Sequence, residues 1–336
     1  MDWKNGYSAR YYITIVDPNS WKDRKRYEIT DGTINKTASE LRESADISCP
    51  DYDLTNEQII RVWLDAFQNG GASHTPLFTG YATTPSREIN GVRETKSLQC
   101  YSVLKPAQDI LLARGWYAPA EIDGSILLKQ LLKPTKSPVG FSEKTIEKRT
   151  LKKSIVAEDG ETNLSMIEKI LYALDWRLVI NGLGEIEIGP YSADYLAVFD
   201  MAYNDILEPS IKVEYDWYEC PNVFRAILDD DVEIARDESD NIMSIPSRGR
   251  EVWAEDTNAT LSEQETLLEY ARRRLKELQS VYTTVTYDRR FQQDIYPTDV
   301  VYLNYPSHDL VGKYVIVSQS IALDFNAKTA EEVRKI

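Results

Sequence analysis

The sequence contains few of the residues that catalysis most often uses. It has only two histidines, His74 and His308, and three cysteines, Cys49, Cys100 and Cys220. Histidine is the usual general base near neutral pH, yet both histidines lie in unrelated stretches with turn-like sequences. No serine stands in a GxSxG motif. We therefore interpret both histidines as surface turn residues and expect a protein that is not an enzyme.

The spacing of the cysteines and the lack of long apolar runs exclude further classes of protein. The three cysteines are far apart and form no CxxC pair, so we expect neither a disulfide framework nor a structural zinc site. Residues 1–10 are polar and aromatic, unlike the apolar core of a signal peptide. No apolar run is long enough to span a bilayer. The sequence thus predicts folding in a reducing cytosol, with no cofactor, no metal and no membrane contact.

Positive charge is also scarce. The chain has 39 basic and 54 acidic residues, which gives a net charge of −15. A surface that binds nucleic acid needs the opposite sign, whereas an acidic surface repels DNA. The densest part of the acidic excess is formed by Asp229, Asp230, Asp231, Glu233, Asp237, Glu238 and Asp240. A solvated acidic loop is the simplest interpretation, because this stretch lacks the glycine and the final glutamate of an EF-hand calcium loop.

Tyrosine, in contrast, is abundant, with 21 residues against 7 phenylalanines. A tyrosine ring packs on an apolar surface while its hydroxyl reaches water or a polar partner, which suits exposed sheets and subunit interfaces. Tyrosine also has a high propensity for strands. The sequence leaves both interpretations open.

The first hundred residues have the pattern of an antiparallel β domain. Predicted strands cover residues 7–16, 27–34, 41–49, 59–67, 76–80 and 97–103. In the fourth of these, the β-branched residues Ile59, Ile60 and Val62 favour a strand over a helix. Asn69 and Gly70 predict a tight turn after it. Short strands at this density indicate a small barrel or sandwich.

The middle of the chain changes to helical periodicity. Residues 123–132 carry leucines and isoleucines at helical spacing and end before Pro134. A second helix is expected to begin after Thr162, a good N-cap residue. Residues 176–190 form two β runs around Asn181 and Gly182, a pair typical of two-residue hairpin turns. Residues 106–205 are therefore predicted to form a small α+β domain.

The last part of the chain combines strands with one amphipathic helix. Ser262 and Glu265 have the spacing of a capping box, and Leu268, Ala271 and Leu275 follow on one helical face, so we expect a helix over residues 262–279. Strands are predicted at residues 211–215, 222–228, 232–236, 281–287, 299–305 and 312–325, with an irregular loop at 242–251 and a short charged tail at the end. The chain is thus predicted to be an α+β, β-dominated protein with domains at residues 1–105, 106–205 and 206–336.

The order of several short motifs resembles that of the hub proteins of phage tails and baseplates. These motifs lie at residues 40–48 with 60–62, 77–80 with 97–101, 176–186, 222–227, 271–278, 297–301 and 312–317. They are similar, in turn, to the early strand pairs, the middle hairpin, the central strand, and the closing helix and strands of those proteins. The resemblance spans nearly the whole chain. It includes the tail-hub and late-control families of contractile tails and the N-terminal part of siphophage tail-associated proteins.

The resemblance implies two tube-type antiparallel β-barrels with an intervening small α+β domain. It also implies a homotrimer, a ring of six barrels that joins a sixfold tail tube to a threefold spike or tip. The implied partners are further copies of the chain, the tail tube protein, the spike or tail-tip protein and other baseplate proteins, in a virion tail assembled in the host cytoplasm. DNA passes through such a ring without specific binding. We expect the following acidic residues to face that channel: Asp229, Asp230, Asp231, Glu233, Asp237 and Glu238.

Two other functions remain open. A carbohydrate-binding tail-tip adhesin could use exposed aromatic residues that stack on sugars, namely Trp116, Tyr117, Trp217 and Tyr218. A cell-wall hydrolase needs only two carboxylates at the right separation. Nothing in the sequence groups aromatic and acidic residues as a sugar cleft does, however, and the family supplies no catalytic residues.

Overall fold

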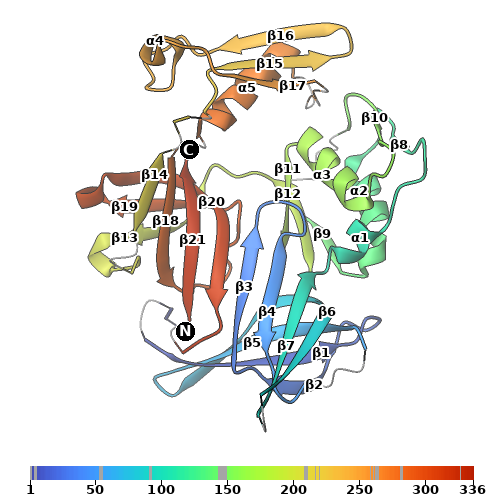
Figure 1. The fold of residues 1–336 in the computed structure, drawn as a ribbon, viewed down its shortest axis with the longest axis vertical. Helices are drawn as coiled ribbons and strands as arrows, with labels where there is room; N and C mark the ends of the chain where they lie inside the picture. The colour runs from blue at the N-terminus through green and yellow to red at the C-terminus, as the bar shows by residue number, and fades with distance from the viewer. Residues whose placement is uncertain are drawn as a thin grey trace.

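The protein is built mainly of antiparallel strands (Figure 1). The computed structural model describes residues 2–3, 6–52, 56–90, 93–142, 150–207, 211–215, 217–218, 220–257, 259, 261, 265–280, 283–325 and 327–336. Strands from both ends of the chain join in one 13-stranded sheet, and three smaller sheets lie outside it. The expected α+β, β-dominated architecture is confirmed. No helix in the described ranges has both the length and the apolarity that a membrane crossing requires.

The first seven strands form what we call the N-terminal block. They are β1 (Ser8–Val16), β2 (Asp23–Glu28), β3 (Asp31–Thr37), β4 (Glu43–Ser48), β5 (Gln58–Gln68), β6 (Gly71–Asn90) and β7 (Arg93–Ser102). Their order is β2-β1-β5-β6-β7-β4-β3, with all neighbours antiparallel. Ile34, Ala45 and Ile47 are buried at alternate positions, as expected of strands that cover a core on one side. Asn69 and Gly70 both have positive φ (49° and 78°), which confirms the predicted tight turn.

Strand β6 changes partner half-way along its length. It pairs with β5 up to Ala82 and with β7 from Gly80 onwards. A Cβ atom on Gly80 would lie 2.2 Å from the carbonyl oxygen of Tyr101 and 2.5 Å from the ring of Phe78. Only glycine fits there, so Gly80 marks the point where the chain passes from one layer of the block to the other.

The last part of the chain contributes a second set of strands, the C-terminal block. They are β13 (Tyr195–Asp200), β14 (Lys212–Tyr215), β18 (Thr283–Arg290), β19 (Val300–Tyr305), β20 (Leu310–Ala322) and β21 (Lys328–Lys335), with short 3₁₀ helices at Met201–Tyr203 and Pro306–His308. Their order is β14-β18-β21-β20-β19-β13, and only the β13–β19 pair is parallel among these strands. Phe199, Val285, Leu303, Tyr314 and Val333 pack in the core of this block.

Strand β21 corrects the expectation of a charged tail after the last strand. It lies between β18 and β20, with Thr329, Glu331 and Val333 buried and the residues between them partly exposed. The buried carboxylate of Glu331 lies 2.5 Å from the guanidinium of Arg289, which neutralises it. Lys328–Lys335 is therefore a central strand of the sheet. Its charged residues are unusual for such a position, and the partner that permits the burial of Glu331 lies on another strand, where the local sequence does not reveal it.

The two blocks share one strand order. The consecutive strands β3 to β7 lie in the order β3-β4-β7-β6-β5, and their counterparts lie in the order β14-β18-β21-β20-β19. Both β6 and β20 carry a register shift at the equivalent point, between Ala82 and Thr84 and between Ile316 and Ser318. The blocks are thus structural repeats, joined by the antiparallel pairing of β20 with β3. The described strand pairings do not close either block, so the two tube-type barrels remain a prediction.

A middle unit lies between the two blocks in the sequence. It contains α1 (Lys105–Asp109), β8 (Tyr117–Ala118), α2 (Gly124–Leu132), the 3₁₀ helix Lys133–Thr135, β9 (Val139–Phe141), β10 (Ile155–Val156), α3 (Asn163–Ala173), β11 (Trp176–Ile180) and β12 (Ile186–Pro190). Both predicted helices are confirmed. Thr162 caps α3 in a capping box with Ser165. Leu128, Ile167 and Trp176 are among the residues of its separate core. The predicted domain boundaries at 105 and 205 remain predictions.

The β11–β12 hairpin is confirmed, but its turn is longer than predicted. Residues 181–185 separate the two strands. The side-chain oxygen of Asn181 accepts hydrogen bonds from the N–H groups of Leu183 (3.0 Å) and Glu185 (3.1 Å). The positive φ falls on Gly184, so the prediction of a two-residue turn formed by Asn181 and Gly182 is wrong.

A small layer between residues 220 and 280 interrupts the C-terminal block after β14 (Figure 1). It consists of β15 (Val223–Leu228), β16 (Asp231–Arg236), α4 (Ile245–Arg248, within the predicted irregular loop), β17 (Trp253–Asp256) and α5 (Leu267–Ser280). Helix α5 packs on β15 and β16 and buries Tyr270 and Leu275. The predicted cap residue Ser262 lies outside the described residues. The described capping box is formed by Thr266 and Glu269, whose side chains accept from each other's N–H groups at 2.8 and 3.3 Å.

Candidate functional site

Eight neighbouring strands give the molecule a broad face on the side of the sheet away from the cores. Their path, β14-β18-β21-β20-β3-β4-β7-β6, runs from left to right across Figure 1. Because side chains alternate along a strand, the residues between the buried ones lie on this face. Most are small and polar, and we call the following set the polar face: Thr33, Asn35, Ser44, Asp46, Ser48, Ser97, Gln99, Thr284, Thr286, Asp288, Ser318, Ser320, Glu332 and Arg334.

The polar face and the positions that border it carry charges of both signs. Within the set, Asp46, Asp288 and Glu332 carry carboxylates and Arg334 carries a guanidinium, which lies 3.5 Å from the carboxylate of Glu332. The alternate positions of the same strands add three cations and three carboxylates: Lys212, Arg290, Lys328, Asp31, Glu88 and Glu214. Lys328 forms an ion pair with Asp288. Carboxylates therefore outnumber cations on this side of the sheet, which disfavours binding to the phosphates of a nucleic acid.

The seam between the two blocks crosses the polar face where β20 meets β3. On this face the hydroxyl of Ser320 donates a hydrogen bond to the side-chain oxygen of Asn35 at 2.9 Å. On the core side Gln319 lies directly opposite Lys36. The ammonium of Lys36 lies 2.7 Å from the carboxylate of Glu43, and both side chains are at most 5% exposed. The hydrogen bond between Ser320 and Asn35 thus crosses the seam in addition to the backbone hydrogen bonds, and the Lys36–Glu43 ion pair lies beside it.

A second buried ion pair lies beside the seam. Arg289 and Glu331 are 2% and 0% exposed in their side chains. Gln319 also donates a hydrogen bond to the same carboxylate at 2.6 Å. Burial acts to lower the pKa of Arg289, but the adjacent carboxylate of Glu331 outweighs it and keeps that pKa above its usual value. Arg289 therefore keeps its charge, and the members of the network depend on one another.

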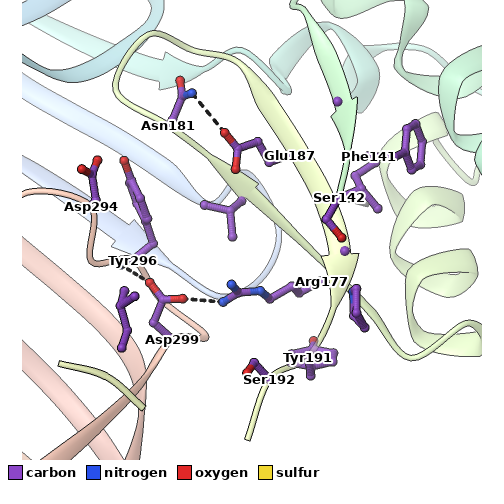
Figure 2. A pocket seen from close by; sticks show the side chains of 16 residues that line it. Phe141, Ser142, Arg177, Asn181, Glu187, Tyr191, Ser192, Asp294, Tyr296 and Asp299 are labelled. Atoms are coloured by element: carbon purple, nitrogen blue, oxygen red, sulfur yellow. Dashed lines mark hydrogen bonds and ion pairs between the residues drawn. The ribbon is translucent and has the colours of Figure 1, made fainter. Parts of the chain in front are cut away.

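A cavity of about 750 Å³ lies between the middle unit and the C-terminal block (Figure 2). From β11, Arg177 reaches across it to Asp299, with 2.6 Å between guanidinium and carboxylate, and donates to the hydroxyl of Thr298 at 3.1 Å. Tyr296 lies beside them, and its N–H donates to Asp299 at 2.8 Å. These contacts make the cavity a junction that ties two units together.

The charged and polar side chains of this cavity are engaged with one another. Burial, followed by the carboxylates of Asp294 and Glu43, raises the pKa of Tyr296 above its usual range, so its phenol stays neutral. The one guanidinium among the described lining residues, that of Arg177, is already paired. Those lining residues include neither a histidine nor a cysteine.

The acidic residues predicted to face a channel lie together in the small layer. They occupy the β15–β16 turn, strand β16 and the turn after it: Asp229, Asp230, Asp231, Glu233, Asp237 and Glu238. Asp229 pairs with Lys153 of the middle unit at 2.9 Å. Asp237 accepts a hydrogen bond from Gln279 of α5 at 2.8 Å. The six residues therefore belong to one hairpin outside the polar face, and their position relative to a channel stays a prediction.

The aromatic residues considered for sugar stacking lie in two separate places. Trp116 packs on the core of the middle unit, and Tyr117 is 56% exposed in β8. Trp217 and Tyr218 lie by the small layer and are 54% and 78% exposed. A shallow cavity of about 400 Å³ lies beside this second pair, with Arg248 donating to the carbonyl oxygen of Trp217 at 2.6 Å. The structure therefore forms no single cleft from these four residues.

The two histidines lie in different blocks. His74 lies in strand β6, which corrects the expectation of a turn, and its Nδ1 is 2.6 Å from the carboxylate of Asp65 on β5. His308 lies in the C-terminal block, in the 3₁₀ helix Pro306–His308. All three cysteines are buried, and burial raises the pKa of Cys49 to about 11. No three His, Cys, Asp or Glu side chains in the described ranges gather as a metal site.

Comparisons with known proteins identify the fold. No protein-family model and no curated protein matches the chain. The tail protein from Neisseria meningitidis MC58 has a TM-score of 0.70 at 15% identity, over 98% of this chain and 97% of that one. The 43 kDa tail protein of prophage MuSo2 from Shewanella oneidensis has a TM-score of 0.68 at 12% identity, over 98% of each chain. An E. coli component of the type VI secretion system, described as similar to the T4 phage tail proteins gp27 and gp5, has a TM-score of 0.53 at 10% identity, over 92% of this chain and 74% of that one.

The first two of these similarities extend over nearly the whole of both chains. They therefore cover both blocks, the middle unit and the small layer, rather than a single β domain. At this level of identity the likeness concerns the fold. It confirms the resemblance that the motif order indicated: this chain has the fold of phage tail and baseplate proteins.

Proposed function

We propose that this protein is the hub of a phage tail or of a phage-like contractile injection system, a structural part rather than an enzyme. The observation that carries the proposal is the pair of blocks with one strand order, joined into a single sheet that exposes a polar face. The fold shared with tail proteins supports it. Fold alone does not specify function, and the proposed role follows from what this sheet can do.

The two similar blocks of the chain fit the symmetry of a tail. Three copies of a chain with two similar blocks provide six similar units, and a closed ring of them has both threefold and approximate sixfold symmetry. We propose that one side of this homotrimer meets a sixfold tail tube and the other a threefold spike or tip, together with other baseplate proteins. Such a part belongs to the virion tail and is assembled in the host cytoplasm.

In the proposed ring, the polar face lines the channel through which DNA passes. Short hydroxyl and amide side chains do not project far, and the excess of carboxylates repels phosphate, so DNA slides past without being held. We propose that the acidic hairpin extends this negative surface at one mouth of the channel through Asp229, Asp230, Asp231, Glu233, Asp237 and Glu238. The hub makes no specific contact with DNA in this scheme.

Electron cryomicroscopy of the particles that contain this protein tests the proposal. The expected result is a ring of three chains between tube and tip, with the polar face toward the bore. The mass of the purified protein gives a faster test, for which the expected value is three chains. A chain placed on a fibre or on the outer surface of the tail would overturn the hub assignment, as would a bore lined by positive charge.

One observation favours a second function, that of a carbohydrate-binding adhesin. Trp217 and Tyr218 expose large aromatic surfaces beside a cavity, as sugar-stacking residues do. A glycan array with the wild-type protein and the Trp217→Ala variant separates the two functions. Binding that the variant loses would support the adhesin, whereas a hub shows no glycan binding. A zymogram on host cell walls tests the remaining alternative, a hydrolase.

A further inference from the structure

Strand β13 lies at an open edge of the C-terminal block. It pairs with β19, and no other described strand pairs with it. Figure 1 shows it on the left of the molecule, by β19. In an edge strand the backbone N–H and C=O groups of alternate residues point away from the one neighbouring strand. These groups can therefore pair with an extended segment of another chain.

The N-terminal block shows what covers the equivalent strand. The order β6-β5-β1-β2 in that block matches the order β20-β19-β13 in the C-terminal block, so β1 is the counterpart of β13. Strand β1 is paired on both sides, with β5 and with β2. Its central residues Tyr12, Ile13 and Thr14 are at most 8% exposed. Among the described strands, the C-terminal block has no counterpart of β2, and the place beside β13 is open.

The side chains of β13 are typical of a strand that is covered on both faces. Residues 195–199 are Tyr-Leu-Ala-Val-Phe, a run without a charged residue. Uninterrupted runs of this kind belong to strands that are buried on both faces, whereas half-exposed strands alternate apolar and polar residues. Ala197 and Phe199 pack on the core of the block. Leu196 and Val198, however, are 58% and 41% exposed. Strand β13 thus has the sequence of an interior strand and the position of an edge strand.

Exposed apolar side chains are concentrated in and around this strand. Within residues 191–203, the following large apolar side chains are all at least 41% exposed: Tyr191, Tyr195, Leu196, Val198, Met201 and Tyr203. Tyrosine and methionine are enriched in protein interfaces. A concentration of exposed apolar side chains marks a site of interaction, whereas single ones are ordinary.

The two blocks also differ in how their edges are protected. Strand β2, which ends the path of the N-terminal block, exposes Arg24, Lys25 and Arg26. Charged side chains on an edge strand prevent pairing with a wrong partner. Residues 195–199 of β13 carry no such charge. The chain thus protects the edge of one block and leaves the edge of the other without charges, which indicates that a partner covers β13.

We infer that an extended apolar segment of a different protein adds to β13 as one more strand, in the place that β2 occupies in the N-terminal block. Backbone hydrogen bonds hold the segment, as in other cases of strand addition. The site is formed by residues 197–199, where β13 pairs regularly with β19. It ends at Phe199, because the N–H of Asp200 donates to the side chain of Asp205 at 3.1 Å.

The chemistry of the segment follows from the two faces of β13. Val198 lies on one face and Ala197 on the other, so the segment is apolar on both of its faces. The choice of a different protein rests on the proposed function. If β13 paired with β13 of a second copy, the contact would be twofold, which does not fit a threefold ring.

A peptide tests whether this edge accepts a strand. The probe is a short synthetic peptide of alternating valine and tyrosine residues, flanked by lysines and labelled with a fluorophore. We expect the wild-type protein to bind it, and the amides of β13 to exchange more slowly in its presence. Val198→Lys should weaken binding by about tenfold or more, because an apolar contact is lost. The same peptide with N-methyl groups at alternate residues should not bind, since it lacks the donors of the ladder.

Val232→Lys is the matched control. Val232 lies in a different strand, β16, and is 52% exposed, so its substitution should leave peptide binding unchanged. Both valines are exposed, and the thermal unfolding of each variant should match that of the wild type. A wild-type chain that does not bind the peptide, or a Val198→Lys variant that binds it equally well, would overturn the inference.

Photo-cross-linking in assembled particles identifies the occupant. The photoreactive residue benzoylphenylalanine replaces Val198, and mass spectrometry maps the segment to which it cross-links. The expected product joins β13 to an apolar segment of a different protein, and the amides of β13 should exchange more slowly in the particle than in the free chain. A cross-link to a second copy of this chain, or to no protein, overturns the inference. The hub assignment is decided separately, by the position of the chain in the particle.

Discussion

The N-terminal and C-terminal blocks have the same strand order and very different cores. Ile47 lies opposite Leu98 in the N-terminal block, and the equivalent positions of the C-terminal block hold Tyr287 opposite Glu331. Where one block buries two apolar side chains, the other buries a carboxylate that Arg289 neutralises. Backbone pairing and the alternation of buried and exposed residues are therefore sufficient to specify the block. Buried charge replaces apolar packing in it, provided that the charge is paired.

The largest effect is expected from breaking the ion pair of the C-terminal block. Glu331→Ala leaves the guanidinium of Arg289 buried without its partner and should destabilise the fold by about 3–5 kcal/mol. Arg289→Met combined with Glu331→Leu should recover most of this loss, because it removes both charges and keeps the volume. Urea unfolding followed by circular dichroism measures both. If Glu331→Ala is as stable as the wild type, the contrast between the two cores is mistaken.

The second prediction concerns a glycine of β6 whose counterpart in β20 is a tyrosine. Phe78 and Gly80 in β6 correspond to Gly312 and Tyr314 in β20, so each block holds one ring and one glycine in opposite order. Gly80→Ala has no room for its methyl group beside Tyr101 and the Phe78 ring, and should cost about 1–3 kcal/mol.

Thermal unfolding provides the measurement, and Gly6→Ala is the control. A Cβ atom on Gly6 meets nothing within 4 Å, so this change should be nearly neutral. Equal stability of the two variants would show that β6 does not bend as tightly as described.

The third prediction compares a serine at the seam with its equivalent in the other block. Counting from Ala82 and Ile316, the residues before the two register shifts, Ser86 of β6 corresponds to Ser320 of β20. Ser320→Ala removes the hydrogen bond to Asn35 and should cost about 0.5–1.5 kcal/mol. Ser86→Ala removes an exposed hydrogen bond with the hydroxyl of Ser97 and should cost less, about 0.5 kcal/mol. Chemical denaturation measures both variants, and an equal cost would contradict the comparison.

The smallest effect is expected at the N-terminal caps of two helices, because the cap of α5 contains a charged residue and the cap of α3 does not. Glu269 accepts from the backbone and the hydroxyl of Thr266, and these bonds lower the pKa of Glu269. A lowered pKa contributes stability above the ordinary glutamate range that is lost as pH falls through the folded value. Helix α3, capped by Thr162 and Ser165, has no such group at its start.

Hydrogen exchange at acidic pH measures this difference. The first amides of α5 should lose protection as Glu269 takes up a proton, while those of α3 keep theirs. Glu269→Gln, which is neutral throughout, should abolish the pH dependence at α5.

Local patterns in the sequence predicted most of the elements. The β-branched run at Ile59 and Ile60 became β5, and the cap at Thr162 begins α3. Strand β21 was missed because Glu331 looks like a surface residue until Arg289, on another strand, is brought beside it. The alternation of Thr329, Glu331 and Val333 was the available signal.

The repeat and the polar face could not be read from local patterns. Equivalent positions of the two blocks hold unlike residues, such as Leu98 and Glu331, so the blocks do not align as sequences. Along the sequence, charge is densest in the acidic run near Asp229, which lies outside the polar face. The polar face is spread over many strands, each of which contributes short residues such as Ser44 and Ser48, and it exists only once those strands are paired.

The β11–β12 hairpin holds both blocks at once. Its tip enters the N-terminal block, where the carbonyl oxygen of Gly182 accepts from Thr79 at 2.8 Å and that of Leu183 accepts from Arg61 at 3.0 Å. Its stem is bound to the C-terminal block through Arg177 and Asp299. Because the hairpin is anchored on either side of the seam, it fixes the angle at which the two blocks meet. In the proposed ring, that angle sets the radius of the bore.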